Sequence, residues 1–248
     1  MLRALVATLF AILFLIFSIP ALGIEYLIGK KDKEKADLQS LRIVQWAFRV
    51  IIKLCGTKVT VIGHDHVPKD RAVLYVCNHQ SYFDIIISYT LCEGLTGYIA
   101  KDDLEKVPVL SAWMRRLYCL FLKRDDLRAG LKTIITACDQ VKRGISMCIF
   151  PEGTRNSGKE LLPFHEGSFK IAEKTGCPII PVAISNTSDI IRDHMPRVKR
   201  VEVTLEYGEP IDPTALTKEE KRALGHTVRE RIQGMLSENT LSVDLQHP

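Results

Sequence analysis

The chain has 248 residues, of which 46% are hydrophobic and 25% are charged. This composition fits one large domain, or a domain with a membrane appendage, and the chain contains no internal repeat or low-complexity tract. The net charge of +5 suits an anionic membrane surface or a phosphorylated substrate better than duplex DNA, so we expect no nucleic-acid partner.

The N-terminal segment is apolar enough to contact lipid. Residues 4–19 carry no charge, and the apolar character continues to residue 28 with Glu25 as the one interruption. Three interpretations are open: a signal peptide, a single spanning helix, and a helix that enters the bilayer and turns back at Pro20. Four lysines follow the segment: Lys30, Lys31, Lys33 and Lys35. This positive charge predicts that the following domain lies on the cytoplasmic face of the inner membrane. The chain has seven cysteines and no C-x-x-C pattern, which indicates reduced core residues. Reduced cysteines are typical of the cytosol, so they agree with a cytoplasmic location of the domain.

A second segment, residues 41–54, alternates apolar and basic positions in a helical rhythm and contains Trp46. It is typical of an amphipathic helix that lies in the headgroup plane, or of an ordinary packed surface helix. The charged residues 30–37 between the two segments are interpreted as a linker. We therefore divide the chain into membrane-associated helices over 1–56 and an α/β domain over 57–248.

After Gly56, short strand-like runs alternate with helical patterns, which predicts a mixed, largely parallel sheet flanked by helices. The predicted strands are residues 58–62, 72–77, 97–100, 118–122, 146–150, 179–184 and 201–207. The predicted helices are residues 81–91, 108–115, 126–142, 168–174 and 218–236. The clearest of these helices has one apolar stripe, formed by Leu127, Leu131, Ile134, Ile135, Cys138 and Val141.

The most informative motif follows the second predicted strand, where His79 and Asp84 are five positions apart. On a continuous helix they would be about 140° apart, and on a strand they would point to opposite faces. A strand, turn and helix in succession lets the carboxylate fold back to the imidazole, and Ser81 with Asp84 has the pattern of a capping box. Such a pair can act as a general base. Alternatively, Asp84 only caps the helix and His79 is an ordinary turn histidine.

A second turn follows the strand 146–150 and reads Pro151, Glu152, Gly153, Thr154, Arg155. Gly153 allows a sharp backbone turn, and the planar fork of Arg155 suits a phosphate. Strand ends at one edge of a sheet gather site residues, so this turn is predicted to lie near His79. An ordinary surface turn is the alternative for this stretch taken alone.

Together these two turns resemble the glycerolipid acyltransferases, and within them the enzymes that acylate lysophosphatidic acid. Two further family patterns are present: Lys101, Leu104, Ser111 and Arg124 form one, and Ile180, Pro181 and Val182 form the other. The resemblance covers residues 58–207 in order. Ser111 stands where the family has glycine. His165 and Glu166 stand in a block that usually carries basic residues.

The resemblance implies a mechanism. His79 would remove the proton of the acceptor's sn-2 hydroxyl as that oxygen attacks an acyl thioester, and Asp84 would orient the imidazole, with no acyl-enzyme. The implied product is phosphatidic acid. The implied phosphate ligands are Lys101, Arg124 and Arg155. Glu152 and Gly153 would shape the acceptor pocket, and Thr154 is a further substrate-binding residue of the same turn. Ile180 and Pro181 would line the acyl or acceptor cleft.

The resemblance also implies the partners, which are the phospholipid bilayer, lysophosphatidic acid, and acyl carrier protein or coenzyme A as the thioester. We expect no metal and no other cofactor. Three alternatives stay open. The acceptor is glycerol-3-phosphate or another lysophospholipid; the protein is a serine hydrolase that uses Ser81, although no G-x-S-x-G surrounds it; or the chain is a non-catalytic, lipid-binding scaffold.

Overall fold

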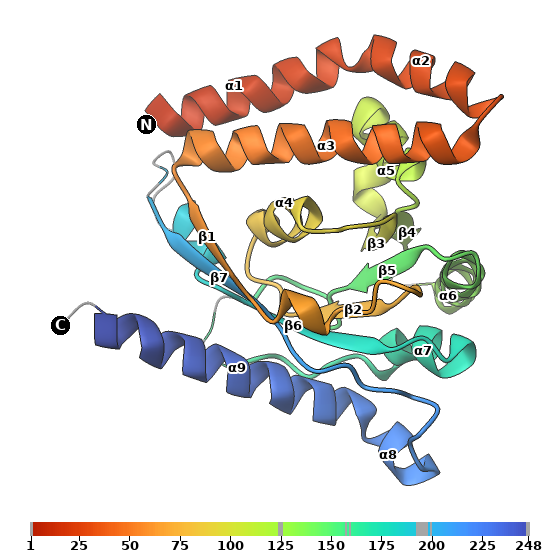
Figure 1. The fold of residues 1–248 in the computed structure, drawn as a ribbon, viewed down its shortest axis with the longest axis vertical. Coiled ribbons are helices and arrows are strands. Elements are labelled where there is room, and N and C mark those ends of the chain that lie inside the picture. Colours follow the sequence, from red (N-terminus) through yellow and green to blue (C-terminus); the bar gives the residue numbers. More distant parts are fainter. Residues whose placement is uncertain are drawn as a thin grey trace.

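The computed structural model describes residues 2–123, 126–156, 158, 160–191, 198 and 200–246, with side chains as far as residue 239. A central sheet lies between two layers of helices (Figure 1). Helices α3, α4 and α5 lie on one face, with α1 and α2 packed outside α3, and α6, α7 and α9 cover the other face.

The helices and strands follow one another in the α/β order that the sequence predicts. The helices are α1 (Leu2–Phe17), α2 (Ile19–Gly29), α3 (Lys33–Cys55), α4 (Tyr82–Thr90), α5 (Pro108–Arg116), α6 (Leu127–Lys142), α7 (Lys170–Thr175), α8 (Lys218–Arg222) and α9 (Leu224–Gln246). The strands are β1 (Lys58–Ile62), β2 (Leu74–Cys77), β3 (Thr96–Lys101), β4 (Leu120–Leu122), β5 (Ser146–Ile149), β6 (Ile179–Ser185) and β7 (Glu202–Tyr207). The short 3₁₀ turns are η1 (His64–His66), η2 (Asp102–Lys106), η3 (Glu166–Phe169) and η4 (Thr187–Ile190).

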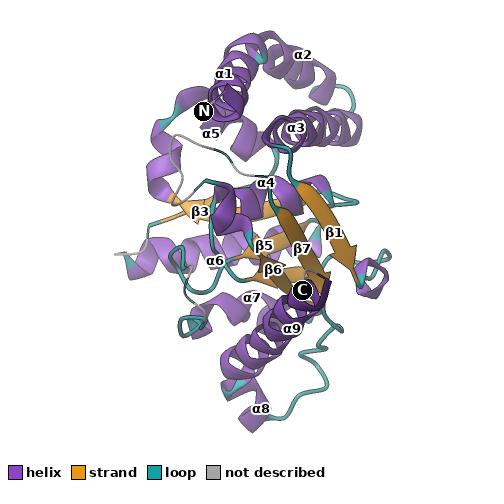
Figure 2. Cartoon of the chain, turned by 90° about the vertical axis from the view of Figure 1, so that its left-hand side faces the viewer, coloured by secondary structure: helices purple, strands orange, loops and turns teal. Residues whose placement is uncertain are grey.

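The described strands form one seven-stranded sheet in the order β1-β7-β6-β2-β5-β3-β4 (Figure 2). Only β6 and β7 pair antiparallel, and the other described neighbours are parallel. The predicted mixed, largely parallel sheet is therefore confirmed. Strand β2 lies in the middle, and both of its faces are covered, which explains its continuous apolar sequence.

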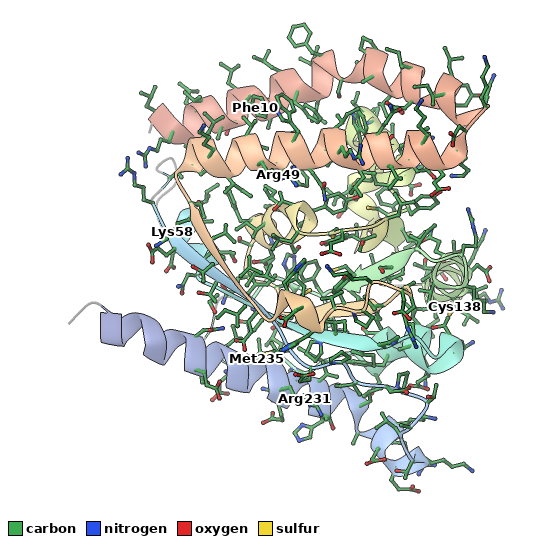
Figure 3. All side chains as sticks on the ribbon, in the orientation of Figure 1. Phe10, Arg49, Lys58, Cys138, Arg231 and Met235 are labelled. Carbon is green, nitrogen blue, oxygen red and sulfur yellow. The ribbon has the colours of Figure 1, made fainter. Side chains whose placement is uncertain are left out.

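The side chains of the strands alternate between two cores. On the α3–α4 side they pack against Leu41, Phe83, Ile87 and Trp113. On the opposite side they pack against Ala137, Val141, Phe169, Val228 and Ile232. Figure 3 shows that Cys138 of α6 and Met235 of α9 belong to the layers on the second side.

The N-terminal helices are tied to the domain by an ionic cluster around one buried carboxylate. Asp37 of α3 is 2% exposed, and its carboxylate lies 2.7 Å from Lys33 Nζ and 3.3 Å from a terminal nitrogen of Arg116 in α5. The Tyr118 hydroxyl also donates to it. Among the described residues no single helix is long and apolar enough to cross a membrane; α1 and α2 reach that length only as a pair bent by 45°.

Three sequence-based expectations need correction. Residues 30–37 are not a linker, because Asp32 accepts from the Lys35 N–H and starts α3 at Lys33. The predicted helix 218–236 is broken at Ala223 into α8 and α9, and α9 continues to Gln246. The apolar stripe of α6 is divided: Cys138 and Val141 are buried, but Leu127, Leu131 and Ile135 face outward.

Candidate active site

The turn between β2 and α4 is organised by the Asp84 carboxylate, which is fully buried. Its Oδ2 accepts from the backbone N–H of Gln80 at 2.6 Å and of Ser81 at 2.7 Å. The Ser81 hydroxyl accepts from the Phe83 N–H at 3.1 Å, and the predicted capping box is confirmed. The first turn of α4 and the position of Asp84 therefore depend on each other.

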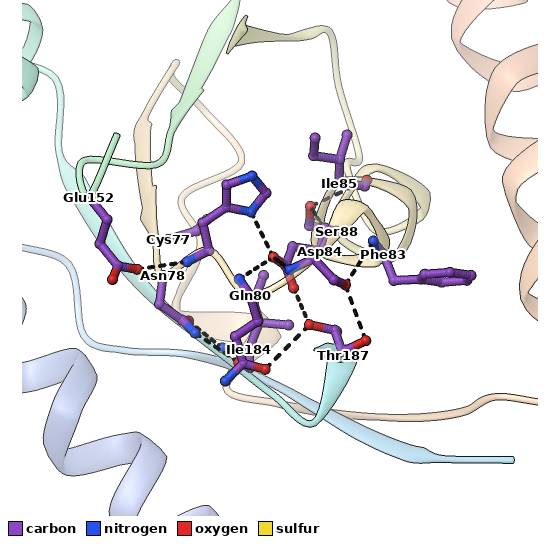
Figure 4. A network of polar contacts seen from close by, with 12 residues as sticks. Cys77, Asn78, Gln80, Phe83, Asp84, Ile85, Ser88, Glu152, Ile184 and Thr187 are labelled. Carbon is purple, nitrogen blue, oxygen red and sulfur yellow. Dashed lines mark hydrogen bonds and ion pairs between the residues drawn. The ribbon is translucent and has the colours of Figure 1, made fainter. Parts of the chain in front are cut away.

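The same carboxylate holds the imidazole of His79. The distance from His79 Nδ1 to Asp84 Oδ2 is 2.7 Å (Figure 4). Because an ionised carboxylate only accepts hydrogen bonds, Nδ1 carries the proton and Nε2 is the free acceptor. The ring stacks on Phe150 with 4.2 Å between centroids, and the side chain is 14% exposed. His79 can thus take a proton through Nε2.

The second turn supports the first through Glu152. Its side chain is 4% exposed, and Oε1 accepts from the His79 backbone N–H at 2.9 Å. Oε2 accepts from the Leu162 N–H at 3.0 Å and from Asn156 Nδ2 at 3.1 Å. The Asn156 N–H also donates to the His79 carbonyl at 2.7 Å. Glu152 therefore holds the two turns together, as the labelled carboxylate in Figure 4 shows.

Two residues that our sequence analysis did not select complete the frame. The Asn78 side chain is fully buried; it donates to the Ile184 carbonyl at 2.9 Å and accepts from the Ile184 N–H at 2.8 Å. The Thr187 hydroxyl donates to Asp84 Oδ1. Both contacts join the β2–α4 turn to the end of β6, more than 100 residues away in the sequence. No local pattern marks Thr187, whereas Asn78 adjoins the motif.

The predicted phosphate ligands have different surroundings. The Arg155 guanidinium lies over the Tyr82 ring, 4.2 Å from its centroid, and has no carboxylate partner among the described residues. Lys101 ends β3 and is paired with Asp103. Arg124 lies outside the residues that the structure describes. Of the two predicted cations that the structure describes, Arg155 is the one without a carboxylate partner, and it lies beside the turn that carries His79.

The other predicted site residues lie around the second turn or deeper in the sheet. Gly153 has a φ of +70°, and a Cβ there would lie 3.0 Å from His165 Nε2. Thr154 is exposed on the same turn. Ile180 and Pro181 are buried in β6, opposite residues 75 and 76 of β2, so they support the strand that leads to His79.

Among the residues that the structure describes, the hydroxyl and thiol groups near the His79 turn are engaged or protonated rather than poised to form an acyl-enzyme. The Ser81 hydroxyl donates to the Thr187 carbonyl at 3.1 Å while it caps α4. Burial raises the pKa of Cys148 well above that of an exposed thiol, and burial raises the pKa of Cys92 to about 12, so both stay protonated near pH 7. No group of three or more metal-ligating side chains occurs among the described residues. The arrangement favours direct proton transfer by His79.

Fold and site together define an α/β protein with a hydrogen-bonded histidine–aspartate pair at the carboxyl edge of its sheet. The acyltransferase family profile matches residues 58–185, which is more than half of the chain. The chain belongs to the acyltransferase family.

Named relatives extend the likeness over most of the chain. The 1-acyl-sn-glycerol-3-phosphate acyltransferase of Escherichia coli strain K12 is 31% identical over 192 residues, covering 77% of this chain and 78% of the relative. The protein of the same name from Borreliella burgdorferi is 29% identical over 194 residues, covering 78% and 77%. The crystal structure of PlsC, the 1-acyl-sn-glycerophosphate (LPA) acyltransferase of Thermotoga maritima, has a TM-score of 0.83 at 29% identity and covers 96% of this chain and 95% of that one.

Proposed function

We propose that this enzyme transfers an acyl chain from a thioester to the sn-2 hydroxyl of lysophosphatidic acid and so forms phosphatidic acid. The observation that carries the proposal is the His79 imidazole, which a buried carboxylate holds through Nδ1. It lies on the turn beside Arg155, whose guanidinium has no carboxylate partner in the described part of the chain. The names of the relatives, which specify 1-acyl-sn-glycerol-3-phosphate, support this acceptor.

The chemistry needs one base and no covalent enzyme intermediate. His79 Nε2 takes the hydroxyl proton as the hydroxyl oxygen forms a bond to the thioester carbonyl carbon. The tetrahedral intermediate then expels the thiolate as the carbon–sulfur bond breaks, and the imidazolium returns the proton to sulfur. Asp84 stabilises the imidazolium and keeps the ring oriented between these steps.

The acceptor phosphate is a dianion that needs charge-assisted hydrogen bonds. Arg155 is the best placed ligand, because its guanidinium is fixed on the Tyr82 ring without a competing carboxylate among the described residues. Lys101 and Arg124 are the other cations that we assign to this phosphate, on the resemblance alone. Glu152 and Gly153 shape the acceptor pocket indirectly, through the turn that they form.

A membrane location is proposed for the N-terminal helices, since both lipid substrates partition into bilayers. Helices α1 and α2 expose many large apolar side chains, including Leu2, Leu9, Phe17 and Leu27. An apolar groove of about 620 Å³ lies between them and α3, lined by Phe10, Phe14 and Trp46 among others. This groove suits acyl chains of surrounding lipid. We place the catalytic domain on the cytoplasmic face, where acyl carrier protein and coenzyme A thioesters are supplied.

The test is acyl transfer from palmitoyl-coenzyme A to lysophosphatidic acid by the purified protein in detergent. We expect phosphatidic acid from the wild type and none above background from His79→Ala. Glycerol-3-phosphate in a parallel reaction tests the alternative acceptor. Equal activity of His79→Ala would exclude this mechanism, and transfer to glycerol-3-phosphate alone would exclude this acceptor. A folded wild type that binds vesicles and acylates no acceptor would support the scaffold alternative.

A further inference from the structure

The outer face of α6 exposes a continuous apolar stripe. Leu127 is 92% exposed, Leu131 is 56% exposed and Ile135 is 48% exposed. The three side chains follow one another at intervals of four residues, so they lie along one side of the helix. Isolated exposed apolar residues are common on proteins, but three in a row on one helix face indicate a contact surface.

This face is separate from the apolar surface of the N-terminal helices. Helix α6 packs on the sheet face opposite to α3 and α4, and α1 and α2 lie beyond α3 (Figure 1). The stripe points away from the sheet, because Ala137 and Val141 form the inner side of α6. A flat bilayer that covers α1 and α2 therefore does not also cover the stripe.

The stripe begins at the edge of the sheet that carries the active site. Strand β4 runs parallel to β3, which runs parallel to β5, and β5 runs parallel to β2, so their carboxyl ends share one edge. His79 follows the carboxyl end of β2, and α6 follows the carboxyl end of β4. A partner seated on the first turns of α6 is on the same edge as the base.

The stripe is bordered by positive charge. Lys123, Arg128 and Lys132 are exposed, and no carboxylate of the described residues pairs with them. The nearby carboxylate of Asp126 is engaged as the helix cap, where it accepts from two backbone N–H groups. The carboxylate of Glu105 in η2, next to β4, is paired with Arg115. Asp139 is an exposed carboxylate one turn beyond Ile135, and Asp126 keeps its negative charge at the cap. Around the first turns of the stripe the three cations outnumber these carboxylates, so the balance of charge there is basic and complements an acidic partner.

We propose that the α6 face, defined by Leu127, Arg128, Leu131, Lys132 and Ile135, docks the acidic carrier protein that delivers the acyl thioester. The inference rests on the proposed acyl transfer and names the source of its donor. A helix of the carrier lays its apolar side on the stripe and its carboxylates on the cations, and the flexible arm reaches the sheet edge with its thioester. Coenzyme A thioesters need no such surface.

The first experiment measures binding of palmitoyl-acyl carrier protein to the full-length protein by fluorescence anisotropy. We expect saturable binding that weakens as salt is raised. Arg128→Glu/Lys132→Glu and, separately, Leu131→Ser should weaken it about tenfold or more. The matched control is Lys218→Glu/Arg222→Glu in α8, which reverses the same number of exposed charges elsewhere and should bind like the wild type. Unchanged binding by the double α6 variant would overturn the proposal.

The second experiment compares the two donors. In Arg128→Glu/Lys132→Glu we expect kcat/KM to fall about tenfold or more with palmitoyl-acyl carrier protein and to stay within about twofold of wild type with palmitoyl-coenzyme A. An equal loss with both donors overturns the proposal. The proposal is also overturned if this variant loses binding to phosphatidylcholine–phosphatidylglycerol vesicles but still binds the carrier, because the stripe would then be a lipid contact. If the wild type acylates nothing but binds the carrier through α6, the docking surface stands and the proposed activity fails.

Discussion

Replacing Glu152 by glutamine tests whether this residue supports the site or contacts the substrate. The side chain keeps its shape, but one acceptor oxygen becomes an NH₂ donor. With the NH₂ at the Oε1 position, the His79 N–H loses its acceptor. With the NH₂ at the Oε2 position, the Leu162 N–H loses its acceptor and Asn156 Nδ2 keeps only the Glu160 carbonyl. At least one partly buried donor is left unpaired in either orientation.

The magnitude follows from these contacts. A buried donor without a partner costs about 1–3 kcal/mol, and the bonds that remain are no longer charge-assisted. We expect Glu152→Gln to lower the free energy of unfolding by about 2–3 kcal/mol, which lowers Tm by about 5–10 °C in a chain of this size. Activity should fall as well, mainly in kcat, because the backbone of His79 is no longer fixed.

Denaturation followed by circular dichroism, together with steady-state kinetics, measures both effects. Glu160→Gln is the matched control, since Glu160 is exposed in the same loop, and its stability should stay within about 0.5 kcal/mol of the wild type. The reasoning is refuted if Glu152→Gln is as stable as the wild type and changes only KM for lysophosphatidic acid. That result would make Glu152 a substrate ligand.

Three further predictions concern single side chains. Thr187→Val keeps the shape but removes the hydroxyl that donates to the Asp84 carboxylate, so kcat should fall about tenfold at constant KM. Thr187→Ser should restore kcat, and an unchanged kcat in Thr187→Val would contradict this role. Tyr82→Ala should raise KM for the phosphate acceptor several-fold, because the Arg155 guanidinium loses the aromatic ring on which it stacks. Tyr82→Phe keeps the ring and should keep the wild-type KM. Equal KM values for the two variants would count against a role for stacking. Asp37→Ala leaves Arg116 without its buried partner, so the free energy of unfolding should fall by about 3–5 kcal/mol in a denaturant titration. A loss below about 1 kcal/mol would show that the cluster does not stabilise the fold.

The sequence predicted the His79–Asp84 contact because that contact is local. Five residues of turn and a capping pattern leave few conformations in which the carboxylate meets the ring, and the observed 2.7 Å contact is one of them. The contacts of Glu152 and Thr187 were not predicted. Each depends on which distant backbone segment lies opposite, and that is decided by the order of strands in the sheet.

The strands were predicted for a similar reason. Both faces of β2, β5 and β6 are covered, so each of these strands is a short, nearly continuous apolar run in the sequence. Such a run predicts a buried strand without knowledge of which strands lie beside it. The start of α3 was missed although Asp32 is a regular N-cap residue, because the lysines around it suggested a linker. The α6 stripe has the period of a buried helix face. Burial depends on tertiary packing, which periodicity alone does not report.

The double role of Asp84 has a consequence for how this protein can change. One carboxylate caps a helix and holds the imidazole of His79, so a substitution at position 84 acts on the start of α4 and on the orientation of the ring together. An apolar residue at this position would remove the cap as well as the partner of the ring, and reduced stability would accompany its inactivity. Asparagine is the replacement that separates the two roles, because its amide oxygen still accepts from the Ser81 N–H whereas the negative charge beside the imidazole is lost.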